Sequence, residues 1–130
     1  MKLAYAYRFE KILDVKENEK DQARANFEQS KTEFERAATK LYNLLKSKEE
    51  IIDRQEQHMK NGISVFDLKQ HQYYLETLEK SISIWQLKVI EARNKMNIME
   101  SRLKDSNIEV KKYEKMKEKD FLLFMEQLKQ

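Results

Sequence analysis

Few side chains in this sequence are of the types that carry out chemistry, and its two histidines are the first to consider. His58 and His71 lie on either side of Gly62, near Asp67, and imidazole with carboxylate is a common set of metal ligands. If the chain folds back at Gly62, the histidines fall about one helical turn apart rather than side by side. No further pattern of supporting residues accompanies them. We therefore interpret them as ordinary surface or seam histidines and expect no metal and no other cofactor.

The basic run KKYEKMKEK, residues 111–119, is a second candidate because basic helices can bind nucleic acid or anionic lipid. Glutamates recur within each turn of this run. Over the whole chain, 26 basic and 23 acidic residues leave a net charge of only +3. This balance is not that of a polyelectrolyte, and we expect no nucleic-acid partner.

Composition narrows the remaining chemistry further. The chain has no cysteine, which excludes disulfides, thiolate catalysis and cysteine-based zinc sites. No apolar stretch approaches the roughly 20 residues of a membrane span, and the N-terminal LAYAY is too short for a signal peptide. We therefore expect a soluble, cytoplasmic protein with no direct membrane insertion.

The elements that position these residues are predicted to be helices. The chain contains one glycine and no proline, and Glu, Lys, Gln, Leu and Met are abundant. Asn61 and Gly62 can adopt the left-handed conformation that ends a helix. Ser64 fits the N-cap of a second helix, with Asp67 three residues later in an approximate capping box. A connection this short predicts that the two helices fold back on each other.

A seven-residue repeat supports this hairpin. In the second arm the expected seam residues are Leu68, His71, Leu75, Leu78, Ile82, Trp85, Val89, Ala92, Met96, Met99, Leu103, Ser106, Val110, Tyr113, Lys117, Asp120 and Phe124. In the first arm they are Phe9, Leu13, Lys16, Lys20, Ala23, Phe27, Ser30, Phe34, Ala37, Leu41, Leu44, Lys48, Ile51, Gln55 and His58. Such a repeat is typical of a left-handed coiled coil.

We therefore predict an all-α fold with a single domain. Two long helices, at about 5–60 and 65–128, form an antiparallel coiled-coil hairpin with a short turn at 61–64. A two-helix hairpin offers no concave pocket of the kind that catalysis normally requires, so we expect the protein not to be an enzyme.

The two chain termini are expected to meet, which brings apolar segments together. With the turn near Gly62, the segment LAYAYRF at 3–9, which begins with Leu3, lies close to FLLFMEQL at 121–128. Five consecutive apolar residues cover every side of a helix, so the run 121–125 cannot be buried against one partner helix. This cluster predicts a binding surface, a membrane anchor or a disordered tail. Aromatic residues outside the seam mark a second possible contact region nearer the turn: Tyr42, Phe66, Tyr73 and Tyr74.

Three segments of the sequence resemble the FliJ family of the flagellar type III export apparatus. They are the opening YRFEKILDVKENEKDQA, the segment NGISVFDLKQHQYYLETLEKSI after the first arm, and the later stretch VKKYEKMKEK. The resemblance covers essentially the whole chain. The family's proteins are antiparallel coiled coils similar to the central stalk of the rotary F-type ATPase.

The resemblance implies partners and sites. The terminal end would enter the hexameric export ATPase, FliI, and the surface near the turn would contact the export gate protein, FlhA, at the cytoplasmic face of the membrane. Export chaperones are further implied partners. The implied ATPase contacts are Tyr5, Tyr7, Arg8, Phe9, Phe121, Leu122, Phe124 and Met125. The implied gate contacts are Tyr74, Leu78, Ser81, Trp85, Lys40 and Leu44. Two alternatives stay open, namely the stalk-like adaptor of a virulence-type secretion system and a membrane-peripheral coiled-coil scaffold.

Overall fold

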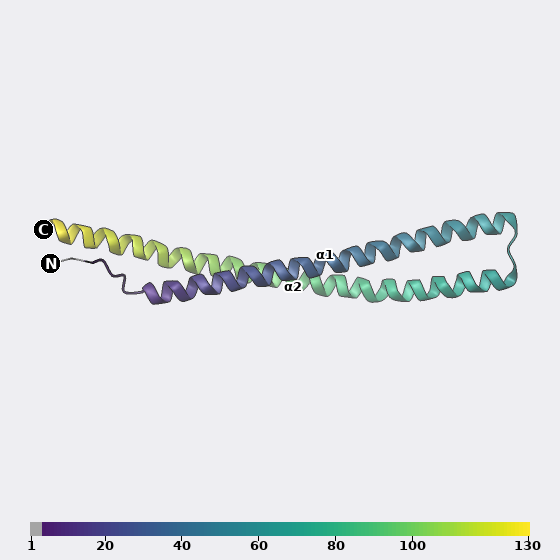
Figure 1. The fold of residues 1–130 in the computed structure, drawn as a ribbon, viewed down its shortest axis with the longest axis horizontal. Helices are drawn as coiled ribbons and strands as arrows, with labels where there is room; N and C mark the ends of the chain where they lie inside the picture. The colour runs from purple at the N-terminus through teal and green to yellow at the C-terminus, as the bar shows by residue number, and fades with distance from the viewer. Residues whose placement is uncertain (1–3) are drawn as a thin grey trace. The chain divides into compact units, whose positions relative to one another are not determined.

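The computed structural model describes residues 4–130, so Leu3 of the expected terminal cluster lies outside the described residues. Two helices, α1 (Glu10–Asn61) and α2 (Val65–Lys129), make up nearly all of this range, and residues 4–130 contain no strand. The helices run antiparallel and are joined by a short turn (Figure 1). The prediction of an all-α antiparallel hairpin is confirmed.

The described chain forms two compact units. Unit 1 combines the N-terminal residues up to 29 with residues 97–130, and unit 2 comprises residues 30–96 with the turn. Within unit 1, the N-terminal segment lies along the last part of α2 (Figure 1). Each unit therefore contains one of the two regions that the sequence marked as possible contact surfaces.

Burial follows the seven-residue repeat closely. All seventeen expected seam positions of α2 are buried or half-buried, as are fourteen of the fifteen in α1. Leu13 and Val110 in unit 1, and Leu78, Ile82 and Val89 in unit 2, are among the most buried apolar side chains. The exception is His58, which is exposed close to the end of α1.

Lysines in the seam are accommodated by ion pairs across the helices. In unit 1, Lys16 Nζ lies 3.9 Å from a carboxylate oxygen of Glu109. In unit 2, Lys48 Nζ lies 3.6 Å from Glu79. Both lysines are half-buried, so their aliphatic stems cover the seam while their charges reach its edge. These pairs explain how a repeat interrupted by charged residues still forms a continuous interface in each unit.

The turn has the geometry that its residues predict. Gly62 has φ of 90°, the left-handed region where a side chain would be strained. The backbone N–H of Asp67 donates to Ser64 Oγ at 3.1 Å, which satisfies one of the unpaired N–H groups at the start of α2. The N–H of Leu68 donates to the carbonyl oxygen of Ser64 at 3.0 Å, the first hydrogen bond of the helix.

The first helix begins later than the sequence predicts, at Glu10 rather than near residue 5. Residues 4–7 have no regular secondary structure. In an extended segment Tyr5 and Tyr7 point to the same side, whereas in a helix two residues of separation would turn them about 200° apart. Both hydroxyls reach α2 only from the extended form, so contacts with α2 outweigh local helical preference here.

Candidate interaction surfaces

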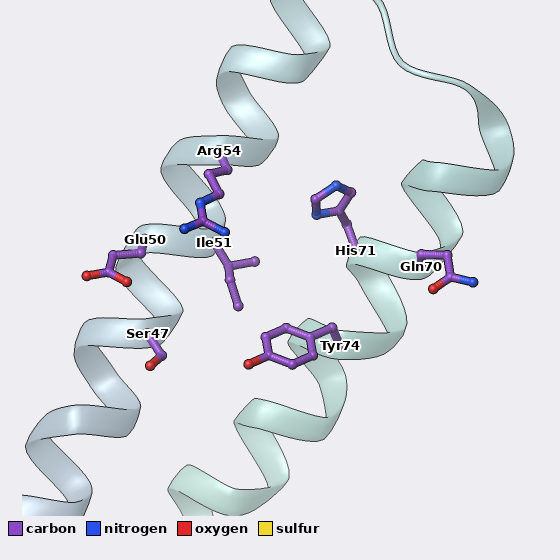
Figure 2. Close-up of a pocket in the computed structure, with 7 residues that line it drawn as sticks. All are labelled: Ser47, Glu50, Ile51, Arg54, Gln70, His71 and Tyr74. Carbon is purple, nitrogen blue, oxygen red and sulfur yellow. The ribbon is translucent and has the colours of Figure 1, made fainter.

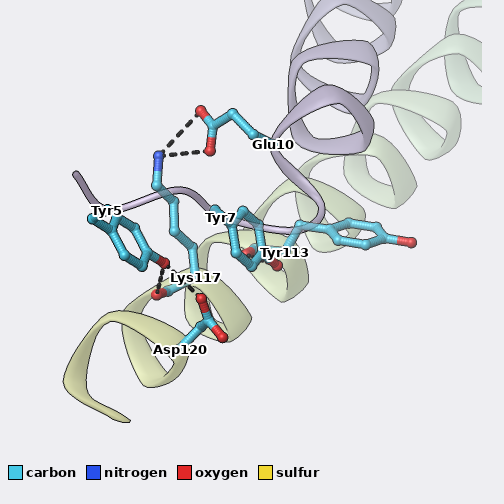
Figure 3. A network of polar contacts seen from close by, with 6 residues as sticks. All are labelled: Tyr5, Tyr7, Glu10, Tyr113, Lys117 and Asp120. Carbon is cyan, nitrogen blue, oxygen red and sulfur yellow. Dashed lines mark hydrogen bonds and ion pairs between the residues drawn. The ribbon is translucent and has the colours of Figure 1, made fainter. Parts of the chain in front are cut away.

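Residues 4–9 form an N-terminal strap across the last turns of α2 in unit 1 (Figure 3). The Tyr7 hydroxyl donates to the carbonyl oxygen of Tyr113 at 3.2 Å, and the Tyr5 hydroxyl lies 3.3 Å from the carbonyl oxygen of Lys117. These carbonyls are one helical turn apart, about 6 Å, which matches two residues of extended chain at about 6.8 Å. The strap is therefore in register with the α2 backbone.

Side chains fasten the strap further. The Tyr5 hydroxyl lies 2.9 Å from Asp120 Oδ2, and its ring contacts Phe121 edge-on at 5.1 Å and Phe124 at 5.4 Å between centroids. At the start of α1, Lys117 Nζ lies 2.9 Å from Glu10 Oε2, a buried oxygen for which it is the charge partner. The strap thus joins the beginning of α1 to the end of α2 by aromatic, polar and ionic contacts.

The same contacts perturb the ionisation of the strap. Burial raises the pKa of Tyr5 to about 12, and its hydrogen bond to Asp120 acts in the same direction. Burial also raises the pKa of Tyr7, whereas the hydrogen bond with Glu10 is the main cause of the raised pKa of Lys117. All three shifts favour the protonated form, so the two phenols and the ammonium are protonated at neutral pH, and their contacts weaken as the pH rises into the alkaline range.

Beyond the strap, α2 ends in exposed apolar side chains. We call Phe121, Leu122, Leu123 and Met125 the terminal surface; they are exposed by 43%, 58%, 58% and 40%. Of the implied ATPase contacts, this set contains all those on α2 except Phe124, which is half-buried against Tyr5.

The implied contacts on the strap differ in accessibility. Arg8 is exposed, and its guanidinium lies 5.4 Å from the centre of the half-buried Phe9 ring. Tyr7 is only 7% exposed and also packs edge-on against Phe9. Its side chain is therefore buried in the contact between the strap and α2.

Near the turn, unit 2 contains a groove between the helices of about 450 Å³. We call it the hairpin groove, and its lining residues are Ser47, Glu50, Ile51, Arg54, Gln70, His71 and Tyr74. Figure 2 shows the Tyr74 ring from α2 directed toward α1, beside Ile51. The lining combines the apolar Ile51 and the Tyr74 ring with polar and charged groups, a mixture that suits a polar helix or loop of a protein partner.

Of the six implied gate contacts, Tyr74 lines this groove and the other five are not part of its lining. Tyr74 is 54% exposed, and Lys40 is exposed. Leu78 is buried at 7% exposure, so it serves as core. The others, Leu44, Ser81 and Trp85, are half-buried. The Lys88 ammonium lies over the Trp85 ring, 4.4 Å from its centre, and so places a positive charge beside this side chain.

The expectation for the histidines was wrong in one respect. Their ring centroids are 5.6 Å apart, so His58 and His71 lie side by side instead of one turn apart. The cause is the register of the hairpin. The two helices pair about a point just after Gly62 rather than about Gly62 itself, so that His58 lies opposite His71. Within residues 4–130, no group of three or more histidine, cysteine or carboxylate side chains is placed to hold a metal ion.

Sequence reasoning missed Ser47, Glu50 and Arg54 as parts of the hairpin groove. The signal that could have found them is their place in the repeat: Ser47 and Arg54 are seven residues apart at the edge of the seam, the same edge as Tyr74 on α2. For the strap, the missed signal is the alternation in Tyr5-Ala6-Tyr7, which has the period of extended chain.

Comparison with known proteins decides the family. The family described as "Flagellar FliJ protein" matches residues 5–130. The chain belongs to the FliJ family. The Flagellar FliJ protein of Bacillus subtilis (strain 168) is 43% identical over 122 residues, which cover 94% of this chain and 83% of that relative. The strap from Tyr5 onward, the terminal surface and the hairpin groove lie within the part of the chain that matches the FliJ family.

The fold has a solved counterpart. The structure of the YscO homolog CT670 from Chlamydia trachomatis is similar with a TM-score of 0.53 at 18% identity, covering 97% of this chain and 82% of that one. At this identity the likeness concerns the fold alone. In the part of this FliJ-family chain that the structure describes, neither helix has a stretch long and apolar enough to cross a membrane.

Proposed function

We propose that this FliJ-family protein is a non-catalytic adaptor of flagellar protein export. It engages the hexameric export ATPase through the terminal surface and the export gate through the hairpin groove, at the cytoplasmic face of the membrane. The observation that carries the proposal is that four of the five residues at 121–125 are exposed apolar side chains at the end of α2, with Leu122 and Leu123 each 58% exposed. Flagellar family membership supports the class of partner.

The terminal surface suits the inside of a protein ring. Four adjacent apolar side chains on one helix end form a patch that a partner must cover to remove it from water. The strap holds this end of the hairpin together, because Tyr5 packs on Phe121 from the N-terminal side. Two helices cannot contact six subunits equally, so binding favours some subunit states over others and can promote assembly or sequential hydrolysis.

The hairpin groove is the proposed site for the gate. Tyr74 offers a large, partly exposed aromatic ring with a polar tip, and Arg54 lies across the groove from it. Side chains of these two types contribute disproportionately to binding at protein interfaces. Export chaperones are the third class of partner, and the adaptor would pass them between the ATPase and the gate.

A variant of the terminal surface tests the ATPase contact. We expect Leu122→Asp with Leu123→Asp to reduce retention of the purified export ATPase by about tenfold or more, and to abolish any stimulation of its hydrolysis. The matched control is Ile98→Asp with Ile108→Asp, which places the same two charges on side chains of α2 that are 51% and 63% exposed within unit 1. Equal retention by both variants contradicts the assignment.

Liposome flotation separates this function from a membrane scaffold. Wild-type protein is mixed with vesicles of anionic phospholipid, alongside the variant Phe121→Asp with Phe124→Asp. The proposal expects no flotation of either protein. Flotation of the wild type that the variant loses would favour a lipid anchor instead.

A further inference from the structure

One edge of α1 changes character along the helix. Four residues after Leu13, Lys20 and Phe27 of the seam stand the charged Glu17, Arg24 and Lys31. In the following heptads the same position is apolar, at Ala38, Leu45, Ile52 and Met59. In a two-helix coiled coil this edge position is normally charged, because it borders the seam and faces water. Apolar residues there widen the stripe to that of a helix that packs on more than one neighbour.

These side chains are not covered in the structure. Leu45, Ile52 and Met59 are exposed by 40%, 36% and 59%, all within unit 2. We call these three residues the edge stripe. They extend over about 21 Å of helix at 1.5 Å per residue, the length of two heptads.

The edge stripe is separate from the hairpin groove. Ser47 and Arg54 line the groove, and each lies two residues from a member of the stripe. Two residues correspond to about 160° around the helix axis, with the seam between them. The two sets therefore lie on opposite edges of the unit 2 interface, and one partner helix cannot cover both.

The charges beside the stripe indicate what covers it. Glu49 and Glu56 each follow a member of the stripe by four residues and so lie next to it on the outer side of α1. Both are exposed, and within residues 4–130 neither forms an ion pair. On the α2 side the stripe is bordered by Glu79, which is paired with Lys48. The unpaired charges beside the stripe, at Glu49 and Glu56 on its outer border, are therefore acidic.

A second copy of this chain fits this border poorly. Two stripes related by a two-fold axis near Ile52 would bring Glu49 of one copy close to Glu56 of the other, on both sides. Like charges at such positions oppose association. A helix with lysine or arginine beside its apolar residues would instead pair with both carboxylates.

We propose that the edge stripe is a docking face for an amphipathic helix of another protein, with basic residues flanking its apolar heptads. The bound helix packs as a third helix against α1 and α2 in unit 2. Its apolar residues cover Ile52 and its neighbours, while its basic residues pair with Glu49 and Glu56. This docking face does not depend on the proposed export function, since it shares no residue with the terminal surface or the hairpin groove.

The probe for this face is a fluorescein-labelled peptide of about 21 residues with leucine at the seam positions of each heptad and lysine beside them. Like charges keep such a peptide from pairing with itself. A second peptide carries glutamate in place of each lysine. Fluorescence anisotropy measures binding of both peptides to the full chain.

We expect the lysine peptide to bind the wild type about tenfold or more tightly than the glutamate peptide. The variant Ile52→Gln with Met59→Gln should bind the lysine peptide more weakly than the wild type does, by a similar factor. Because Glu49 and Glu56 are exposed, Glu49→Lys with Glu56→Lys leaves the fold intact, as circular dichroism checks, and should reverse the preference between the peptides. Ile84→Gln with Ile90→Gln, at exposed side chains of α2 in unit 2, is the control and should leave the affinity unchanged.

Three results overturn the proposal. The first is that the lysine peptide does not bind, and the second is that it binds the wild type and the Glu49→Lys, Glu56→Lys variant equally well. The third is self-association of the protein in sedimentation velocity that Ile52→Gln with Met59→Gln abolishes, which would assign the stripe to a second copy.

Discussion

At the scale of single residues, Tyr5 and Tyr7 show how a tyrosine can belong to the fold rather than to a contact surface. Both hydroxyls reach backbone carbonyls of α2. Those carbonyls already accept helical hydrogen bonds, and the tyrosines use the second lone pair. Tyr73 and Tyr74 are 74% and 54% exposed, so their side chains remain available to a partner. The sequence did not separate these two pairs of tyrosines because the difference arises from tertiary contacts.

The raised pKa of Tyr5 gives a prediction at this scale. The folded-state pKa of about 12 lies above the ordinary value of 10.0, so the contribution of Tyr5 to stability is complete below about pH 10 and is lost as the pH rises toward 12. Absorbance titration of tyrosinate should show a late-ionising phase in the wild type, to which Tyr5 and Tyr7 both contribute. That late phase should be smaller in Tyr5→Phe.

The matched control for this titration is Tyr73→Phe, which removes an exposed tyrosine. It should retain the late phase at its full size. A late phase of unchanged size in Tyr5→Phe would show that the strap contacts do not form in solution.

A pair of leucines on α2 tests the seam. Leu78 is 7% exposed and Leu87 is 64% exposed, and both are in unit 2. Leu78→Ala should lower the free energy of unfolding by about 2 to 4 kcal/mol, because it removes buried apolar atoms and leaves a cavity. Leu87→Ala should change it by less than about 0.5 kcal/mol. Urea unfolding followed by circular dichroism measures both, and similar losses would mean that the seam is misplaced.

At the scale of the elements, the turn is held by two residues with separate roles. Gly62 supplies a backbone conformation with φ of 90°, and no atom lies within 4 Å of where a Cβ would be. Gly62→Ala should therefore lower the free energy of unfolding by the backbone strain alone, about 1 kcal/mol. Ser64→Ala should cost about 1 kcal/mol through the lost N-cap.

The control for the cap is Ser83→Ala, the same change at an exposed position inside α2. It should be neutral or slightly stabilising, because alanine is the better helix former. Thermal unfolding of the three variants distinguishes these outcomes. Equal effects at Ser64 and Ser83 would contradict the cap assignment.

The elements also show where sequence reasoning succeeds. The helices, their antiparallel order and the turn were predictable, because a seven-residue repeat and a lone glycine are local signals. The start of α1 at Glu10 was not, since the strap is fixed by hydrogen bonds to residues more than 100 positions away. The approach of His58 to His71 depends on register, which the repeat leaves uncertain by a turn.

At the scale of the whole molecule, the surfaces are divided between the two units. The terminal surface and the strap belong to unit 1, while the hairpin groove and the edge stripe belong to unit 2. None of these surfaces shares a residue with another. A protein built in this way can hold different partners without competition between them, which suits an adaptor.

This division makes the central claim testable with two variants and two partners. Affinities of purified export ATPase and of the export gate's cytoplasmic domain are measured by calorimetry for Leu122→Asp with Leu123→Asp and for Tyr74→Ala, with Tyr73→Ala as the control. We predict that the first variant no longer binds the ATPase but still binds the gate domain. Tyr74→Ala should still bind the ATPase but no longer bind the gate domain, and the control should bind both. Loss of both partners in either variant, or of neither in both, would contradict an adaptor with two separate binding surfaces.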